Sequence, residues 1–383
     1  MAKRLTSQWW LWPLGIFLAS RVVTTLLMLT AAWFQGKNYW TDAHPDYFSF
    51  AGFWDAEWYG RIFDHWYPTT LPIGADGLVQ QNEWAFLPLF PLLVKATFLP
   101  WKIGAPVLAT VFALLFALVA YRLFERVLQD KTRARWALAF TLFCAVSPIL
   151  QVGYAESLAL LSIALILSGI VRRRWLHVVV FLPVLAFTRP GVLAFAATFG
   201  LMFLVSLFTK RYSMVERLII IGLGAWSLVL GFAWPFIAGV VTGNPQAYFL
   251  TEMSWRYGYT HSLEFTPFSG WVIAFGQFFG GVTGLIILVL VAANLAYLMF
   301  AKPVRQTREL GLYSAGYIAY LFAVFFPQSS TWRLLYPLFP LGAALAIKLP
   351  GWSRWTILVA FVASQWVWLQ WCWVYVAPDF TPP

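Results

Sequence analysis

Residues 104–124 read GAPVLATVFALLFALVAYRLF and contain a single charged residue, Arg122. A helix of this length rises about 1.5 Å per residue and crosses a hydrocarbon core about 30 Å thick. Similar apolar runs recur along the 383-residue chain, which is 61% hydrophobic and only 11% charged. Soluble domains are about half apolar, and lipid accepts a helix because its backbone groups bond to one another. The sequence therefore predicts an all-α polytopic membrane protein.

We predict about eleven membrane-spanning helices in one integral membrane domain, residues 1–383. Several of the apolar runs are short, so one pair could be re-entrant instead of spanning. The first run is too long for a cleaved signal peptide and is predicted to be the first span. The predicted spans are residues 9–34, 104–124, 136–150, 156–171, 175–188, 191–208, 218–240, 271–300, 311–326, 334–348 and 355–376.

The charged residues predict which side of the membrane each connecting segment faces. With a cytoplasmic N-terminus, 18 of the 26 Lys and Arg residues fall on the cytoplasmic side, as the positive-inside rule requires. Topology therefore explains the net charge of +11, and nucleic acid is not a predicted partner. Most acids fall in the outer segments, chiefly 35–103 and 241–270. Acids contribute little to orientation, so function is a candidate reason for their position. Residues 84–100 contain three prolines and are predicted to lie at the outer interface.

Residues 53–62 read FWDAEWYGRI and place two acids and an arginine among aromatic residues of the first outer loop. Asp55 suits a general base, because aromatic walls exclude water and stack on sugars while the carboxylate accepts a proton from a hydroxyl. The alternative interpretation is a solvated loop acid, or a cap on an interfacial helix.

Arg189 and Arg333 each occupy a short outer turn between predicted spans. Two arginines that converge could hold a phosphate through bidentate hydrogen bonds. Alternatively, they reach to lipid headgroups or pair with Glu156. Glu156 begins a predicted span, where helix capping and packing explain an acid about as well as catalysis does.

No metal or nucleotide site is predicted. The two cysteines, Cys144 and Cys372, lie in apolar runs and form neither a CxxC motif nor a disulfide framework. The histidines lack a metal-binding spacing, although the segment DAHPD (42–46) could bind a divalent cation. The sequence contains no Walker loop, no GxGxxG motif after a strand and no GxSxG elbow.

Four segments resemble, in order and approximate spacing, the PIG-V family of membrane mannosyltransferases, and a fifth resembles the arginine-containing C-terminal pattern of that family. This family includes the enzyme that adds the second mannose of GPI anchors, and bacterial relatives. The pairing of the WD motif with the AFxPLFP segment is the most specific part, and the last segment is less specific. The segments are FWDAEWYGRI (53–62), NEWAFLPLFPLL (82–93), GYAESLALL (153–161), TRPGVL (188–193) and TWRLLYPLFPL (331–341).

The resemblance implies a GT-C glycosyltransferase fold whose active site lies on the non-cytoplasmic face, in the first large loop. It implies a polyprenyl-phosphate-mannose donor, a glycolipid or glycan acceptor, and no cofactor or metal. Asp55 would be the catalytic base, and Arg333, with Arg189, would bind the donor phosphate. The other substrate-site candidates are Trp54, Glu57, Trp58, Asn82, Trp84, Tyr154 and Glu156.

Three other interpretations stay open. A GT-C transferase for another lipid-linked sugar, such as glucose or arabinose, fits the same residues. A lipid or sugar transporter predicts inverted repeats and charges near the membrane midplane, and a scaffold has no need for acids and arginines that converge. The compact chain and the resemblance favour the plasma membrane of a bacterium over the endoplasmic reticulum.

Overall fold

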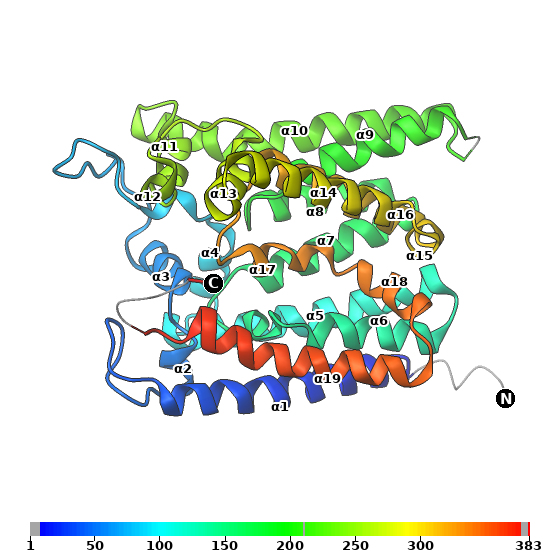
Figure 1. The fold of residues 1–383 in the computed structure, drawn as a ribbon, viewed down its shortest axis with the longest axis horizontal. Coiled ribbons are helices and arrows are strands. Elements are labelled where there is room, and N and C mark those ends of the chain that lie inside the picture. The colour runs from blue at the N-terminus through cyan, green and yellow to red at the C-terminus, as the bar shows by residue number, and fades with distance from the viewer. Residues whose placement is uncertain (1–7, 210, 377–381) are drawn as a thin grey trace. The chain divides into compact units, whose positions relative to one another are not determined.

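The structure is a computed structural model that describes residues 8–209, 211–376 and 382–383 (Figure 1). Within these ranges there is no β-strand, and one isolated antiparallel bridge joins Ile73 to Val79. The all-α prediction is therefore confirmed. Residue contacts divide the chain into two compact units, and each unit is assembled from separated parts of the sequence. Unit 1 comprises Met1–Glu57, Val94–Arg174 and Ser329–Pro383, and unit 2 comprises Trp58–Leu93 and Trp175–Gln328. The prediction of a single domain stays a prediction.

Unit 1 is built around α7, which is buried along almost its whole length. A stripe of fully buried alanines on α5 lets neighbouring helices approach closely, and α6 and α7 are its main partners. These alanines are Ala105, Ala109, Ala113, Ala117 and Ala120. The helices of the unit are α1 (Leu11–Phe34), α2 (Tyr47–Phe50), α5 (Trp101–Leu128), α6 (Lys131–Phe143), η2 (Ser147–Gln151), α7 (Glu156–Val171), α17 (Thr331–Leu334), η3 (Tyr336–Leu338), α18 (Leu341–Lys348), α19 (Gly351–Trp368) and the π-helical turn η4 (Leu369–Trp373).

A buried arginine stabilises the break between α6 and η2. Arg21 lies in the middle of α1 and is 7% exposed. Its guanidinium donates to the carbonyl oxygens of Leu142 and Ser147, at 3.4 and 3.1 Å, and to the side chain of Gln151 at 2.9 Å. The end of α6 leaves carbonyl groups without helical donors, and Arg21 supplies hydrogen bonds to this region.

Unit 2 is organised by α9, which packs between α10 and α16. The close approach of α9 and α16 depends on Gly316, because a Cβ there would lie 2.5 Å from the hydroxyl of Thr198. The helix α3 (Asp55–His65) begins in unit 1 and continues into unit 2. The helix α4 (Leu89–Lys95) begins in unit 2 and ends in unit 1. The other helices of unit 2 are η1 (Glu83–Ala85), α8 (Trp175–Ala186), α9 (Leu193–Leu207), α10 (Met214–Thr242), α11 (Ala247–Ser254), α12 (Tyr257–Thr260), α13 (Ser269–Phe279), α14 (Gly281–Met299), α15 (Lys302–Gln306) and α16 (Arg308–Val324).

The predicted span over residues 271–300 was wrong, because the chain forms two helices there. The break is at Gly280, whose φ of 82° and ψ of 153° lie in a region that essentially only glycine occupies. Beyond the break, α14 packs against α13 at Gly284. A Cβ at Gly284 would lie 2.3 Å from the carbonyl oxygen of Phe275.

Two more predicted spans are interrupted. Over 334–348, Pro337 and Pro340 divide the segment into η3 and α18, because proline removes a backbone donor. Over 136–150, α6 ends at Phe143 and a separate 3₁₀ turn follows. The predicted interfacial segment 84–100 contains the seven-residue helix α4, which is too short to span a bilayer.

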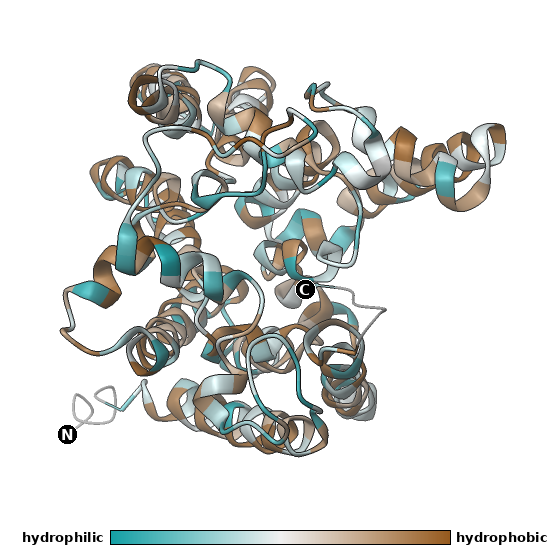
Figure 2. Cartoon of the chain, turned by 90° about the vertical axis from the view of Figure 1, so that its left-hand side faces the viewer, coloured by the Kyte–Doolittle hydropathy of each residue, from teal (hydrophilic) through white to brown (hydrophobic). Residues whose placement is uncertain are grey.

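Among the described residues, four helices are long and apolar enough to cross a membrane: α1, α5, α10 and α14. The helices α7, α8 and α9 are apolar but shorter. The sequence predicted that several of the spans are short, and the count of about eleven spans stays a prediction. Hydrophobic residues predominate along the helices, while hydrophilic residues are more frequent in the connecting segments (Figure 2). This distribution supports an integral membrane protein.

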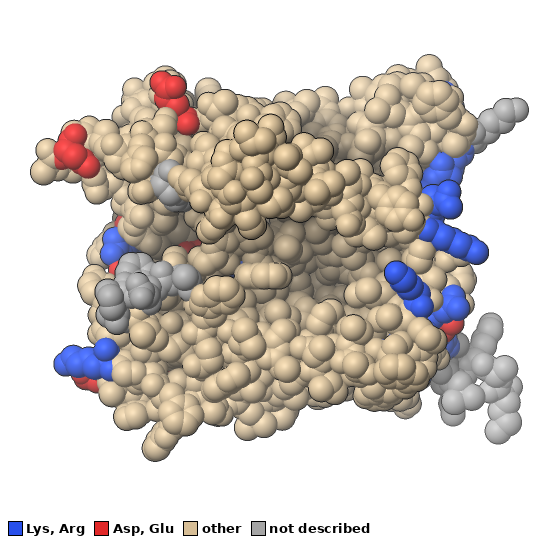
Figure 3. Space-filling model, in the orientation of Figure 1, with Lys and Arg blue, Asp and Glu red and all other residues tan. Residues whose placement is uncertain are grey.

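Basic side chains gather at one end of unit 1, where α1 and α19 begin and α5 ends. Arg122 of α5 lies over Trp9, with 4.7 Å from guanidinium carbon to ring centroid. At the start of α19, Arg354 lies 6.0 Å from the ring of Trp136. The acid Glu156 is the first residue of α7. The basic residues Arg172, Arg173 and Arg174 directly follow its last residue, at the opposite end of the helix. On the face shown in Figure 3, the helices of each unit are uncharged over most of their length. That the basic end faces the cytoplasm stays a prediction.

Candidate active site

The first turn of α3 is held in place by its surroundings in unit 1. Trp54 precedes the helix with a φ of 60°, a left-handed conformation that is uncommon for a residue with a side chain. Its indole N–H donates to the carbonyl oxygen of Trp373 at 2.8 Å. The backbone N–H of Asp55 donates to the Tyr154 hydroxyl at 3.0 Å. The strained turn and its two hydrogen bonds fix the position of the Asp55 carboxylate.

The chain comes unusually close to this turn at Gly153. Its backbone N–H donates to the carbonyl oxygen of Ala51 at 3.1 Å. A Cβ at Gly153 would lie 3.1 Å from the Cβ of Ala56, the residue after Asp55. The glycine therefore allows the segment before α7 to pack directly beneath the first turn of α3.

Arg333 bridges two carboxylates that are distant in the sequence. Its Nη1 lies 2.5 Å from Oδ2 of Asp55, and its Nε lies 3.4 Å from Oε1 of Glu156. The Arg333 and Glu156 side chains are 9% and 6% exposed, whereas that of Asp55 is 23% exposed. Asp55 is therefore the member of the cluster that a molecule from outside can reach most readily.

Tyr154 contacts two members of the same cluster, Asp55 and Arg333. The Arg333 guanidinium carbon lies 5.3 Å from the centre of the Tyr154 ring, a distance at which a cation is attracted to the ring face. The ring also packs on Trp373, with 5.4 Å between centroids. Tyr154 is fully buried. One tyrosine therefore positions both the backbone of Asp55 and the guanidinium of Arg333.

The cluster holds more acidic than basic side chains. Asp55 and Glu156 are two acids, and Arg333 is their shared cation, so the three side chains carry a formal charge of –1 when ionised. Asp55 and Glu156 are also the first residues of α3 and α7. A helix N-terminus stabilises negative charge, so acids are suited to both positions.

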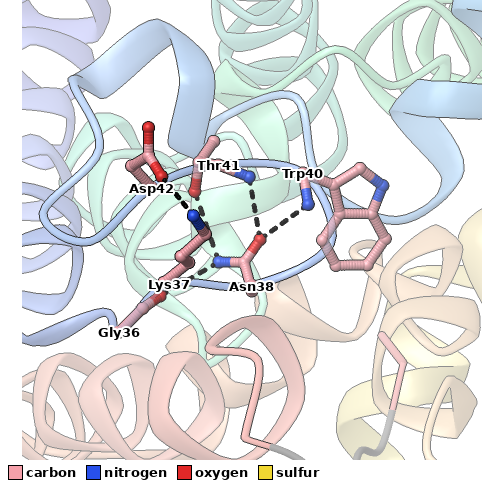
Figure 4. Close-up of polar contacts among 6 residues, drawn as sticks. All are labelled: Gly36, Lys37, Asn38, Trp40, Thr41 and Asp42. Atoms are coloured by element: carbon pink, nitrogen blue, oxygen red, sulfur yellow. Dashed lines mark hydrogen bonds and ion pairs between the residues drawn. The ribbon is translucent and has the colours of Figure 1, made fainter.

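Glu57 lies in the same first turn but contacts a different segment. Its Oε2 accepts a hydrogen bond from the Trp40 indole N–H at 2.7 Å. Asn38 holds the loop before Trp40, because its side-chain oxygen accepts from the backbone N–H groups of Trp40 and Thr41 at 2.8 and 3.1 Å (Figure 4). Trp40 was not among the residues singled out from the sequence.

The other predicted site residues lie in unit 2. Asn82 is fully buried, caps η1 by accepting from the Trp84 N–H at 3.1 Å, and donates to Thr251 at 2.9 Å. Trp84 is also buried, and its indole donates to the carbonyl oxygen of Pro68 at 2.9 Å. These contacts give both residues a structural role, and their contact with substrate stays a prediction.

Trp58 and Arg189 complete the set in unit 2. The Trp58 ring stacks on Phe86, with 6.0 Å between centroids and 7° between planes, and Arg61 lies 4.3 Å from its centre. Arg189 follows α8 and its backbone N–H donates to the carbonyl oxygen of Leu185 at 3.1 Å. The predicted convergence of Arg189 with Arg333 stays a prediction.

Sequence reasoning missed three charged residues that had visible signals. Arg21 stands in the middle of a predicted span, where a charge is costly and marks a specific role. Glu252 and Arg256 are four residues apart, the spacing of a helical ion pair, and their side chains lie 2.8 Å apart.

In the described part of the chain, no three His, Cys, Asp or Glu residues group as metal ligands. A metal-independent reaction stays a prediction.

Comparison with solved structures shows which fold the chain has. The crystal structure of ArnT from Cupriavidus metallidurans bound to undecaprenyl phosphate aligns with 90% of this chain at 14% identity and a TM-score of 0.51. The apo form of that protein aligns with 91% of this chain at 13% identity and a TM-score of 0.48. This chain covers 62% of the ArnT chain in both cases. No protein-family model and no curated protein sequence matches.

The likeness to the lipid-bound structure shows that the chain has the GT-C membrane fold predicted from its sequence. At this identity it shows the fold alone. The narrower resemblance to the PIG-V family stays a prediction.

Proposed function

We propose that this protein is a GT-C glycosyltransferase that moves a sugar from a polyprenyl-phosphate donor to a glycolipid or glycan hydroxyl on the non-cytoplasmic face of the membrane. The observation that carries the proposal is the cluster of Asp55, Glu156 and Arg333. It brings a partly exposed carboxylate and an arginine together beside Glu156, the first residue of the apolar helix α7. The undecaprenyl phosphate bound to ArnT supports a lipid-phosphate donor. Such a donor keeps its tail in the bilayer and its sugar at the interface.

In the proposed reaction, Asp55 accepts the proton of the attacking hydroxyl. The acceptor oxygen forms a bond to the anomeric carbon as the bond from that carbon to the phosphate oxygen breaks. The electron pair of the broken bond stays on the polyprenyl phosphate, and the configuration at the anomeric carbon inverts. Arg333 stabilises the negative charge that develops on the phosphate, and Arg189 is a candidate second donor.

The short contact between Asp55 and Arg333 gives this mechanism an order of events. While this pair holds, Oδ2 of Asp55 is occupied by Nη1 of Arg333. When Nη1 of Arg333 turns towards the donor phosphate, Asp55 becomes free to accept a proton. Glu156 and Tyr154 hold the arginine during this exchange. Oδ2 of Asp55 is then open to the acceptor hydroxyl only when the donor is bound.

We propose mannose as the sugar, because the PIG-V-like segments cover the first loop and all three cluster residues. Trp54, Trp58 and Trp84 are proposed to wall the sugar site, and Asn82 is proposed as a further substrate-site residue from the same loop. The cytoplasmic N-terminus and the bacterial plasma membrane belong to the same proposal, as does a reaction without cofactor or metal.

A transfer assay with the full-length protein in lipid nanodiscs tests the proposal. Undecaprenyl phosphates carrying radiolabelled mannose, glucose or arabinose serve as donors, and octyl α-D-mannopyranoside serves as the acceptor. We expect a disaccharide glycolipid and free undecaprenyl phosphate, formed fastest from the mannosyl donor. Faster transfer from another donor would refute the choice of mannose, and no transfer from all three donors would refute the proposed function.

A further inference from the structure

We propose that Trp40, Glu57 and Tyr375 form a binding subsite for a pyranose ring, next to the strained turn that carries Asp55. This inference rests on the function proposed above and names residues that recognise its sugar substrate. All of these residues belong to unit 1.

Aromatic rings from three parts of the chain meet at this subsite. Trp40 stacks on Phe53, with 5.0 Å between centroids and 26° between planes. Its ring meets those of Trp54 and Tyr375 edge-on, at 4.9 and 5.5 Å. Phe53 and Trp54 are buried, whereas Trp40 and Tyr375 are partly exposed. Two accessible rings therefore rest on a buried aromatic floor.

Dedicated hydrogen bonds hold both accessible rings. Gln35 is 1% exposed and bonds to the backbone of Tyr375 twice, accepting from its N–H and donating to its carbonyl oxygen, both at 2.9 Å. The Asn38 side chain fixes the loop that carries Trp40 (Figure 4). Rings that are ordered before binding lose little freedom when a ligand arrives.

Glu57 adds the polar group that a sugar site needs. A pyranose ring has faces of C–H groups that pack on aromatic rings, and hydroxyls that donate hydrogen bonds. An ionised carboxylate is purely an acceptor, and the Trp40 indole holds that of Glu57 at the edge of the rings. Ligand sites combine apolar walls with a few placed polar groups in this way.

The position of Glu57 relative to Asp55 indicates its role. Residues two apart on a helix diverge by about 200° around the axis. Glu57 therefore binds a different hydroxyl from the one that Asp55 deprotonates. Trp54 links the subsite to the base, because its ring contacts that of Trp40 and it directly precedes Asp55 in the chain. Glu57 and Trp40 would then decide which sugar is accepted, and Asp55 would react with it.

A binding measurement without donor tests the subsite. Saturation-transfer NMR of the full-length protein in detergent micelles reports binding of methyl α-D-mannopyranoside, with mannitol as the open-chain comparison. We expect binding of the ring but not of mannitol. Glu57→Gln should raise the Kd about tenfold or more, the effect of losing a hydrogen bond to a charged group. Trp40→Phe keeps a ring but removes the indole N–H, and should weaken binding by a smaller factor.

Asp42→Asn is the matched control, because Asp42 is a loop acid whose side chain is 88% exposed and pairs with Lys37 at 3.1 Å. It should leave the Kd unchanged, and thermal unfolding confirms that each variant is folded. An unchanged Kd in folded Glu57→Gln, or equal binding of mannitol, would overturn the subsite. If the protein transfers sugar but its sugar binding does not depend on Glu57, this inference alone is refuted. Glu57-dependent binding with no transfer from any donor would refute the proposed function alone.

Transfer kinetics separate the two possible sources of the sugar. If the subsite takes the acceptor, Glu57→Gln raises the KM for octyl mannoside and leaves the KM for the donor unchanged. If it takes the donor sugar, the reverse holds. If both KM values are unchanged, the subsite is overturned.

Discussion

Replacing Arg333 with methionine tests whether the carboxylate cluster is held together as the structure indicates. Methionine has a similar length but leaves Asp55 and Glu156 without their shared cation. Removing one partner of a buried ion pair costs about 3–5 kcal/mol of folding free energy. The cost should arise mainly at Glu156, whose side chain is 6% exposed, because water screens the charge of the more exposed Asp55.

The pairing can be isolated with a double-mutant cycle. Adding Glu156→Gln to Arg333→Met removes the buried charge, so the double variant should be more stable than the sum of the single effects predicts, by about 1–3 kcal/mol. SDS-induced unfolding in mixed micelles, followed by tryptophan fluorescence, measures these differences. Arg305→Met is the control, because Arg305 is exposed. Equal stability of Arg333→Met and Arg305→Met, or strictly additive effects in the cycle, would refute the reasoning.

Three further predictions concern unit 1. Arg21→Met should destabilise the protein by about 3 kcal/mol in SDS unfolding, because buried carbonyl groups of the α6–η2 break lose a charged donor; an effect within the range of the Arg305→Met control would contradict that role. Gly153→Ala should lower the transfer rate more than it lowers the Tm, since a Cβ would press on Ala56 at 3.1 Å and displace Asp55; wild-type transfer would contradict this. For Asp46, burial acts to raise the carboxyl pKa, but hydrogen bonds from Ser49 and Lys102 lower it to about 2. Because the carboxyl pKa is lower in the folded state than in the unfolded state, ionised Asp46 stabilises the fold at pH values above the unfolded-state pKa of about 4. This stabilisation is lost as the pH falls through the folded-state pKa. Asp46→Asn should therefore cost less than about 1 kcal/mol at neutral pH, since the pair with Lys102 is exposed. The cost should shrink as the pH falls through 2 and disappear below it; a penalty that does not shrink would contradict the sign.

The parts that sequence reasoning predicted best are those governed by the cost of charge in lipid. The run from Glu156 to Val171 is bounded by an acid and by three arginines, and the helix has those bounds. The same cost indicated that Asp55, Glu156 and Arg333 were special, and the structure brings these three together. A charged residue in an apolar segment has few other polar residues with which it can pair, so few other pairings are possible.

The features that sequence could not supply depend on backbone geometry and on tertiary contacts. A glycine inside an apolar run does not reveal whether its φ is positive, so the break at Gly280 was hidden. Carbonyl groups at the end of α6 are invisible in a sequence, so Arg21 had no apparent partner. The contact of Trp40 with Glu57 depends on how a loop folds, and the two are 17 residues apart. Nothing in the motif GYAES indicates that Tyr154 contacts both Asp55 and Arg333.

The central claim is that Asp55 is the base of a lipid-linked sugar transfer. The most direct measurement compares Asp55→Asn with the Asp42→Asn control for two quantities, the transfer rate and the affinity for undecaprenyl-phosphate mannose. The account predicts that Asp55→Asn loses about 10²–10⁴ of the rate, while it still binds the donor and unfolds at a similar temperature. A folded Asp55→Asn variant that transfers mannose at the wild-type rate would contradict it.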